Sequence, residues 1–161
     1  MTNPTLFVIP ADPKNQEAAA LTAAATRIAL PGNSDVQLLI ETERDRNDFP
    51  ASFFRQLQED WTKVYVADSR FKAAVYDALT AQGLPVPFYP TLDPKRSRWG
   101  YNDTTNSALC IAYIAGCDLV TRMDAGTLPY PMRFRKLIDD FAKLLLAGPL
   151  EVTGVTYSKR L

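Results

Sequence analysis

Short apolar runs alternate along the chain with longer segments in which apolar residues recur at helical spacing. Runs of about four to eight mostly apolar residues are typical of strands that are buried on both faces of a sheet. This pattern predicts strands at residues 5–9, 36–40, 63–67, 119–123 and 151–157. Because such strands alternate with helices, we expect a doubly wound α/β fold with a mostly parallel sheet and helices on both faces.

The segments between these strands have the periodicity of helices. In the first helix, expected at residues 16–30, Ala18, Leu21, Ala25 and Ile28 share one face. Further helices are expected around residues 53–61, at 70–82, before the turn at Gly116, and at 132–146.

The helix at residues 70–82 is expected to turn Phe71, Val75 and Ala78 inward. Residues 84–100 are rich in proline and are expected to form an extended segment and a long loop.

Length and charge narrow the class of protein. A chain of 161 residues is expected to form a single domain over residues 1–161. Eighteen basic residues balance eighteen acidic ones, which gives no overall field for nucleic acid or an anionic membrane. No apolar run approaches the roughly 20 residues of a membrane span, and the first residues lack the pattern of a signal peptide. We therefore expect a cytoplasmic protein, in which Cys110 and Cys117 are packed thiols rather than a disulfide.

Histidine is absent, so acid–base or metal chemistry would depend on carboxylates. Ligands of open parallel sheets bind outside the carboxyl ends of the strands. The residues at those ends are Pro10, Ala11, Asp12, Glu41, Asp68 and Asp124.

These strand-end residues suggest particular roles. Asp12 or Glu41 can accept hydrogen bonds from a ribose or a base, and Asp124 can bind Mn²⁺ or Mg²⁺ that bridges phosphate oxygens. The alternative for each residue is a solvated turn.

Two further features can contribute to a ligand site. Lys95, Arg96 and Arg98 precede Trp99, and this basic loop can either cradle a diphosphate or form a solvated surface. Asn106, near the start of the fourth helix, can either cap that helix or contact a ligand.

Several common motifs are missing from the sequence. No glycine-rich phosphate loop follows the first strand, which argues against dinucleotide-binding Rossmann enzymes and P-loop NTPases. There is also no G-x-S-x-G elbow, and a triad of the usual kind needs histidine.

Four segments together resemble the nucleotide-sugar-binding half of GT-A glycosyltransferases, of the inverting family-2 kind and its retaining relatives. These segments are FVIPADPKNQ, VQLLIETERD, RWGYNDTTNSALCIAYIAGCDLVTRMDAG and EVTGVTY. The resemblance implies a first-strand turn at Pro10, Ala11 and Asp12, a nucleoside-reading acid at Glu41, and a helix asparagine at Asn106. It also matches the RMDAG segment, with Asp124, to the family's Asp-x-Asp metal motif, and Arg98 would then bind the diphosphate.

The chain departs from the family in two respects. The second aspartate of Asp-x-Asp, which is typically the direct metal ligand, is Gly126 here. The chain also stops where the family usually adds its acceptor-binding part, so we expect a minimal or truncated member, one that uses a partner, or one that no longer transfers sugars.

Two functions remain open from the sequence. The first is transfer of a sugar from a nucleoside diphosphate to an unknown acceptor, with Mn²⁺ or Mg²⁺ as cofactor. The second is a non-catalytic α/β domain that binds a nucleotide or a protein partner. A nucleotidylyltransferase is disfavoured because its glycine-rich first loop is missing. Either function is compatible with a homo-oligomer.

Overall fold

The computed structural model describes residues 4–30, 35–83 and 101–129 of the chain. The basic loop with Arg98, the helix expected at 132–146 and the strand expected at 151–157 lie outside these residues. The described elements are β1 (Thr5–Pro10), α1 (Gln16–Ala29), β2 (Val36–Glu41), the 3-10 helix η1 (Arg46–Asp48), α2 (Ala51–Asp60), β3 (Val64–Ala67), α3 (Ser69–Ala81), α4 (Tyr101–Ala115) and β4 (Leu119–Arg122).

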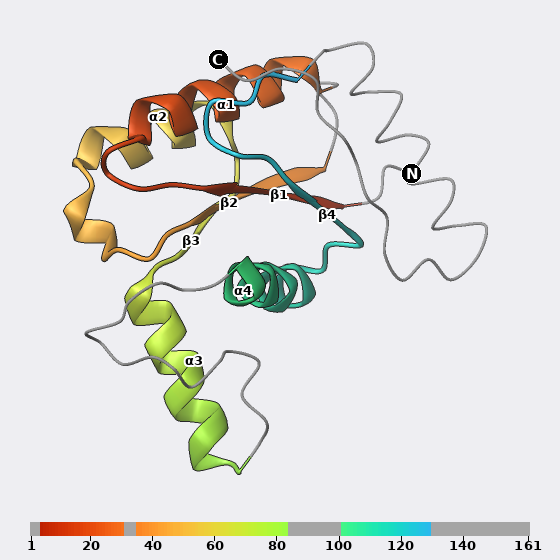
Figure 1. The fold of residues 1–161 in the computed structure, drawn as a ribbon. Helices are drawn as coiled ribbons and strands as arrows, with labels where there is room; N and C mark the ends of the chain where they lie inside the picture. The colour runs from red at the N-terminus through yellow and green to blue at the C-terminus, as the bar shows by residue number, and fades with distance from the viewer. Residues whose placement is uncertain (1–3, 31–34, 84–100, 130–161) are drawn as a thin grey trace.

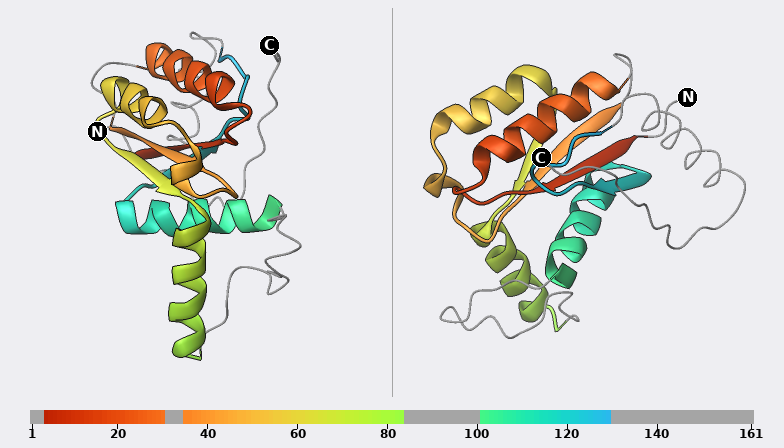
Figure 2. Two further views of the ribbon diagram at one scale, coloured as in Figure 1. Left: turned by 90° about the vertical axis from the view of Figure 1, so that its left-hand side faces the viewer. Right: turned by 45° about the horizontal axis from the view of Figure 1, so that its top comes forward.

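The four described strands form a parallel sheet in the order β3-β2-β1-β4. Helices α1 and α2 lie on one face of the sheet, whereas α4 and the start of α3 lie on the other (Figures 1 and 2). The predicted doubly wound α/β class is therefore confirmed, and each described strand matches its predicted range to within one residue.

The continuous apolar runs of β1 and β2 follow from this layering. Alternate side chains point to opposite faces of a sheet. Phe7 and Leu38 belong to the core under α1 and α2, whereas Leu6, Val8 and Leu39 belong to the core above α4. Since both faces are covered, both sets of positions are mostly apolar, and the buried polar Gln37 of β2 is hydrogen-bonded to the Tyr65 hydroxyl.

Helix α1 uses a face that its apolar periodicity did not indicate. Leu21 is 49% exposed and Ile28 is 76% exposed. The buried side of the helix instead carries small residues, namely Ala19, Ala20, Thr22, Ala23, Thr26 and Ala29. Alanine occurs on both sides of α1, and small side chains allow the helix to approach the sheet closely, so tertiary packing selected the face of smaller residues.

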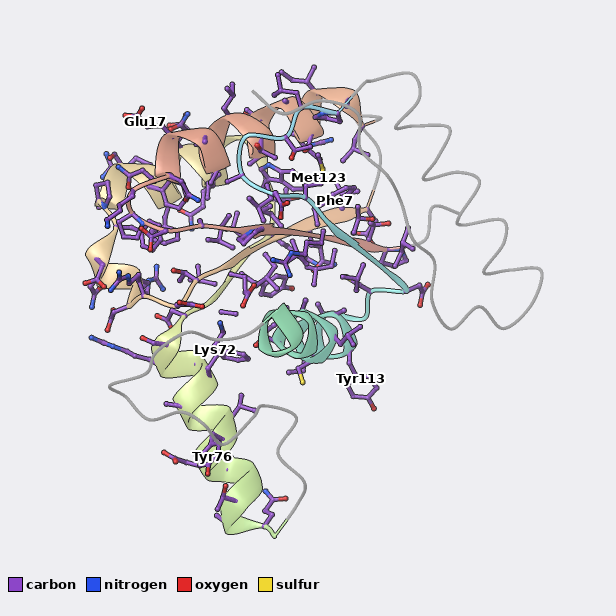
Figure 3. All side chains as sticks on the ribbon, viewed as in Figure 1. Phe7, Glu17, Lys72, Tyr76, Tyr113 and Met123 are labelled. Carbon is purple, nitrogen blue, oxygen red and sulfur yellow. The ribbon has the colours of Figure 1, made fainter. Side chains whose placement is uncertain are left out.

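Helix α3 projects away from the sheet beyond its first turn (Figures 1 and 2). Its predicted inward face is therefore wrong at Ala78, which is exposed, while Phe71 and Val75 are only half-buried. Among the residues of α3 whose burial is described, Lys72 is the buried one, and it lies below the sheet near the start of the helix (Figure 3).

Two smaller expectations can also be checked in the described residues. Cys110 and Cys117 are free thiols, as predicted, and burial raises the pKa of both. Of the helices in the described ranges, none combines the length and the apolar character that crossing a bilayer requires.

Candidate functional site

A cleft of about 540 Å³ opens at the carboxyl ends of β1, β2 and β4. Within the sheet, β2 and then β3 follow on one side of β1, whereas β4 pairs with the other edge of β1. The strand order thus reverses at β1, and open α/β sheets bind ligands at such a reversal. The cleft is lined by Pro10, Ala11, Asp12, Asn15, Glu41, Thr42, Glu43, Arg122, Asp124 and Ala125.

Five residues that the sequence indicated line this one cleft: Pro10, Ala11, Asp12, Glu41 and Asp124. They come from three separate segments of the chain, which the parallel register brings to one edge of the sheet.

The remaining two predicted residues cannot be assigned to the cleft. Arg98 lies outside the described residues. Asn106 lies in the second turn of α4, a helix that contacts β1 and β2.

The Asp12 carboxylate is held by the turn between β1 and α1. Its Oδ1 accepts a hydrogen bond from the backbone N–H of Lys14 at 3.0 Å, and its own N–H donates to Asn15 Oδ1 at 2.7 Å. Arg44 Nε lies 3.4 Å from Oδ2. The Lys14 N–H, followed by Arg44, lowers the pKa of Asp12, so this carboxylate is ionised at neutral pH and can only accept hydrogen bonds.

Glu41 is tied into the floor of the cleft by a buried ion pair. Lys72 Nζ lies 2.8 Å from Glu41 Oε1, and the two side chains are 0% and 1% exposed. Lys72 Nζ also donates to the carbonyl oxygen of Thr42 at 3.2 Å. At the same strand ends, Ala11 N–H donates to the Glu41 carbonyl oxygen at 2.8 Å. Helix α3 is thereby joined to the carboxyl end of β2 through one cation.

Asp124 is exposed and lies on a short loop that follows β4. The loop is fixed to the sheet where Met123 N–H donates to the Val8 carbonyl oxygen at 2.9 Å. It is fixed to α1 where Gly126 N–H donates to Thr22 Oγ1 at 2.9 Å. Gly126 has a φ of +89°, a conformation that residues with a side chain rarely adopt. The backbone here therefore explains why glycine stands at this position.

At Gly126, where the sequence resemblance would place a second carboxylate, the structure has a backbone hydrogen bond to Thr22 instead. Within the described part of the chain, no three carboxylate or thiol side chains gather closely enough to form a metal site. A cation at Asp124 would accordingly need further ligands from a bound molecule or from water.

Asp68, the fourth strand-end acid, has a structural role. Its Oδ1 accepts a hydrogen bond from the Phe71 N–H at 2.9 Å, as the N-terminal cap of α3. Its Oδ2 accepts one from the Arg46 N–H at 3.2 Å, which holds the loop after β2. Asp68 is buried and does not line the cleft.

Sequence reasoning missed several lining residues. Thr42 and Glu43 directly follow Glu41, so extending the strand-end rule by two positions would have found them. Arg122 and Ala125 lie beside Asp124 in the RMDAG segment but were not themselves singled out, and Asn15 carried no comparable signal. Lys72 was also missed, because one lysine in an amphipathic helix looks like an ordinary exposed position.

The charges of the cleft limit what it can bind. Its described lining carries four carboxylates, those of Asp12, Glu41, Glu43 and Asp124, and one guanidinium, that of Arg122. Carboxylates favour ligands with hydroxyl and N–H donors. A phosphate-bearing ligand would need additional positive charge, either from a metal ion or from residues beyond those described.

No family model and no curated protein sequence matches this chain.

Proposed function

We propose that this chain binds a nucleoside diphosphate, in the form of a nucleotide sugar, in the cleft and transfers the sugar as a GT-A-type glycosyltransferase. One observation supports the proposal above all others. Residues 10–12, Glu41 and Asp124 are far apart in the chain, yet they line the same cleft at the point where the strand order reverses. The sequence resemblance assigns residues 10–12 and Glu41 to the donor nucleotide and Asp124 to the metal ion that accompanies it.

The chemistry of the lining suits the two parts of such a ligand differently. Ribose hydroxyls and base N–H groups are donors, which ionised Asp12 and the neighbouring carboxylates can accept. The diphosphate is an anion, and among the described lining residues Arg122 is the one that carries a positive charge. We therefore assign the nucleoside to the β1 and β2 side of the cleft and the diphosphate to the β4 side.

A single carboxylate at Asp124 is compatible with Mg²⁺ or Mn²⁺ binding. Magnesium is commonly held by one or two carboxylates, with phosphate oxygens and water completing its coordination. Asp124 would supply the protein ligand, and the nucleotide would supply the others. A bound cation would offset the negative charge that develops on the departing diphosphate.

One observation favours a second function, metal-independent nucleotide binding without transfer. The Gly126 N–H is engaged with Thr22, at the position where the family carries its second carboxylate. In this alternative, nucleotide affinity does not depend on the cation, and a sugar nucleotide remains intact.

The test is thermal unfolding with UDP, GDP, ADP and CDP, each with and without Mn²⁺ or Mg²⁺. A ligand that binds only the folded state, present at a concentration of 100 times its Kd, stabilises the protein by about 2.7 kcal/mol and raises the melting temperature. We expect the largest shift with one nucleotide plus metal. We then measure whether the protein releases that nucleoside diphosphate from the corresponding sugar nucleotide. Release is expected of a transferase, whereas a protein that only binds the nucleotide leaves the sugar nucleotide intact.

A matched pair of variants locates the site. Asp124→Asn removes the carboxylate in the cleft, whereas Asp118→Asn removes an exposed carboxylate just before the opposite end of β4. Only Asp124→Asn should abolish the metal-dependent part of the shift. If no nucleotide raises the melting temperature with or without metal, the proposed function is wrong.

A further inference from the structure

Two threonines interrupt the alanine-rich buried face of α1. Thr22 and Thr26 are both 0% exposed. A buried hydroxyl is costly unless it is hydrogen-bonded. Thr26 Oγ1 donates to the Thr22 carbonyl oxygen at 2.7 Å, one turn back, and lies 3.4 Å from Met123 Sδ. Thr22 Oγ1 instead accepts the Gly126 N–H at 2.9 Å, from a residue 104 positions along the chain.

The contact to Thr22 completes the fixation of the loop that carries Asp124. On one side of Asp124, Met123 is bonded to β1 and its side chain is buried between the sheet and α1 (Figure 3). On the other side, Gly126 is bonded to Thr22. The Thr127 N–H closes the turn by donating to the Asp124 carbonyl oxygen at 3.0 Å. Asp124 is thus exposed between two anchored neighbours.

We propose that Thr22 is a positioning residue that holds the Asp124 loop at the cleft through its hydroxyl oxygen and the Gly126 N–H. Alanine fills most of this face of α1, so packing alone does not require a hydroxyl at this position. The Thr22 hydroxyl instead accepts a hydrogen bond from Gly126, a residue outside the helix. For its effect on ligand binding, the inference rests on the nucleotide-binding function proposed above.

Loss of this bond should lower affinity rather than unfold the protein. Gly126 is half-buried and lies on a short loop, so we expect the loop to shift and expose its N–H to water when the threonine oxygen is removed. The loop then samples other conformations, and apparent affinity falls with the fraction that remains competent. A neutral hydrogen bond corresponds to a change of about two- to tenfold in such an equilibrium.

The experiment compares Thr22→Val, which keeps the shape, with Thr22→Ser, which keeps the hydroxyl. Thr26→Val is the matched control, because it removes a buried hydroxyl from the same face but leaves the Gly126 bond intact. Amide hydrogen exchange is followed by NMR at Gly126 and Thr127 in the full chain. We expect exchange about two- to tenfold faster in Thr22→Val, with rates near those of the unaltered protein in the other two variants.

The second measurement is the Kd for the best nucleotide with Mg²⁺, which should rise in Thr22→Val alone, by at most about tenfold. If Thr22→Val does not fold, Thr22→Ala replaces it, since alanine suits this helix. Equal exchange rates at Gly126 and Thr127 in Thr22→Val and Thr26→Val would overturn the inference. So would faster exchange with an unchanged Kd. Absence of any nucleotide binding by the unaltered protein would refute the proposed function, while the exchange rates would still decide whether Thr22 holds the loop.

Discussion

Removal of one partner from the buried pair between Lys72 and Glu41 should cost more stability than removal of one partner from an exposed pair near the cleft. The perturbation is Lys72→Met, which keeps most of the side-chain volume but removes the charge. In this variant the Glu41 carboxylate, 1% exposed, loses a counter-ion 2.8 Å away and stays out of water. Removal of one partner from a buried pair is strongly destabilising, because the remaining charge is poorly compensated.

The expected magnitude follows from the geometry. At 2.8 Å and an effective dielectric constant of about 20, the attraction between two unit charges is about 6 kcal/mol. Desolvation of both groups offsets most of this attraction in the native protein, so the pair itself contributes little net stability. In Lys72→Met the attraction is lost while Glu41 stays desolvated. We therefore expect the free energy of unfolding to fall by about 3–5 kcal/mol, which is a large part of the total of about 5–15 kcal/mol for a typical protein.

The assay is urea unfolding at pH 7 for Lys72→Met, Glu41→Gln and the double variant. The double variant should be more stable than the sum of the single losses predicts, with a coupling energy of about 2–3 kcal/mol. Arg70→Ala is the matched control. Arg70 lies on the same turn of α3 and pairs with Asp45, but these side chains are 68% and 25% exposed. An exposed pair contributes about 0–1 kcal/mol. If Lys72→Met costs no more than Arg70→Ala, the reasoning is refuted.

Two further predictions concern the cleft. Gly126→Ala and Gly126→Asp should each lower the free energy of unfolding, measured by thermal unfolding, by about 1–2 kcal/mol. The cause is the positive φ and not a clash, because an added Cβ meets nothing within 4 Å. An unchanged melting temperature in Gly126→Ala would contradict this. The pKa of Asp12 is lowered by folding, so its stabilisation is present above about pH 4 and is lost as pH falls through the folded value. The effect is small because the side chain is 39% exposed. In Asp12→Asn the free energy of unfolding should therefore fall less steeply as the pH is lowered below about 4. The same pH dependence as in the unaltered protein would count against the Lys14 and Arg44 contacts.

The described strands of the sheet could be predicted because a buried strand leaves a local signal, a short run of mostly apolar residues. Fully covered strands favour apolar residues, and β1 and β2 carry them at most positions, with Thr5, Gln37 and Glu41 as buried polar exceptions. The carboxyl end of each strand is then also known, as are the residues that follow it. That knowledge was enough to name Asp12, Glu41 and Asp124 as neighbours in one cleft.

Local pattern could not decide which face of α1 is buried. Both sides of this helix carry small apolar residues, and the larger Leu21 and Ile28 are turned outward. The choice depends on how closely the helix must approach the sheet, a property of two elements together. The same limit applies to Asp68, which looks like a strand-end ligand until its carboxylate is seen to accept hydrogen bonds from the N–H groups of Phe71 and Arg46.

By itself, the sequence determined the α/β class, the order of strands and helices over the described residues, and the acidic character of the strand ends. These depend on periodicity and on chain order. Tertiary structure alone decided that Glu41 is paired with Lys72, 31 residues away, and that Gly126 is bonded to Thr22, 104 residues away. Hydrogen bonds and ion pairs act over about 3–4 Å, so partners distant in the chain are fixed only when the packed elements bring them together.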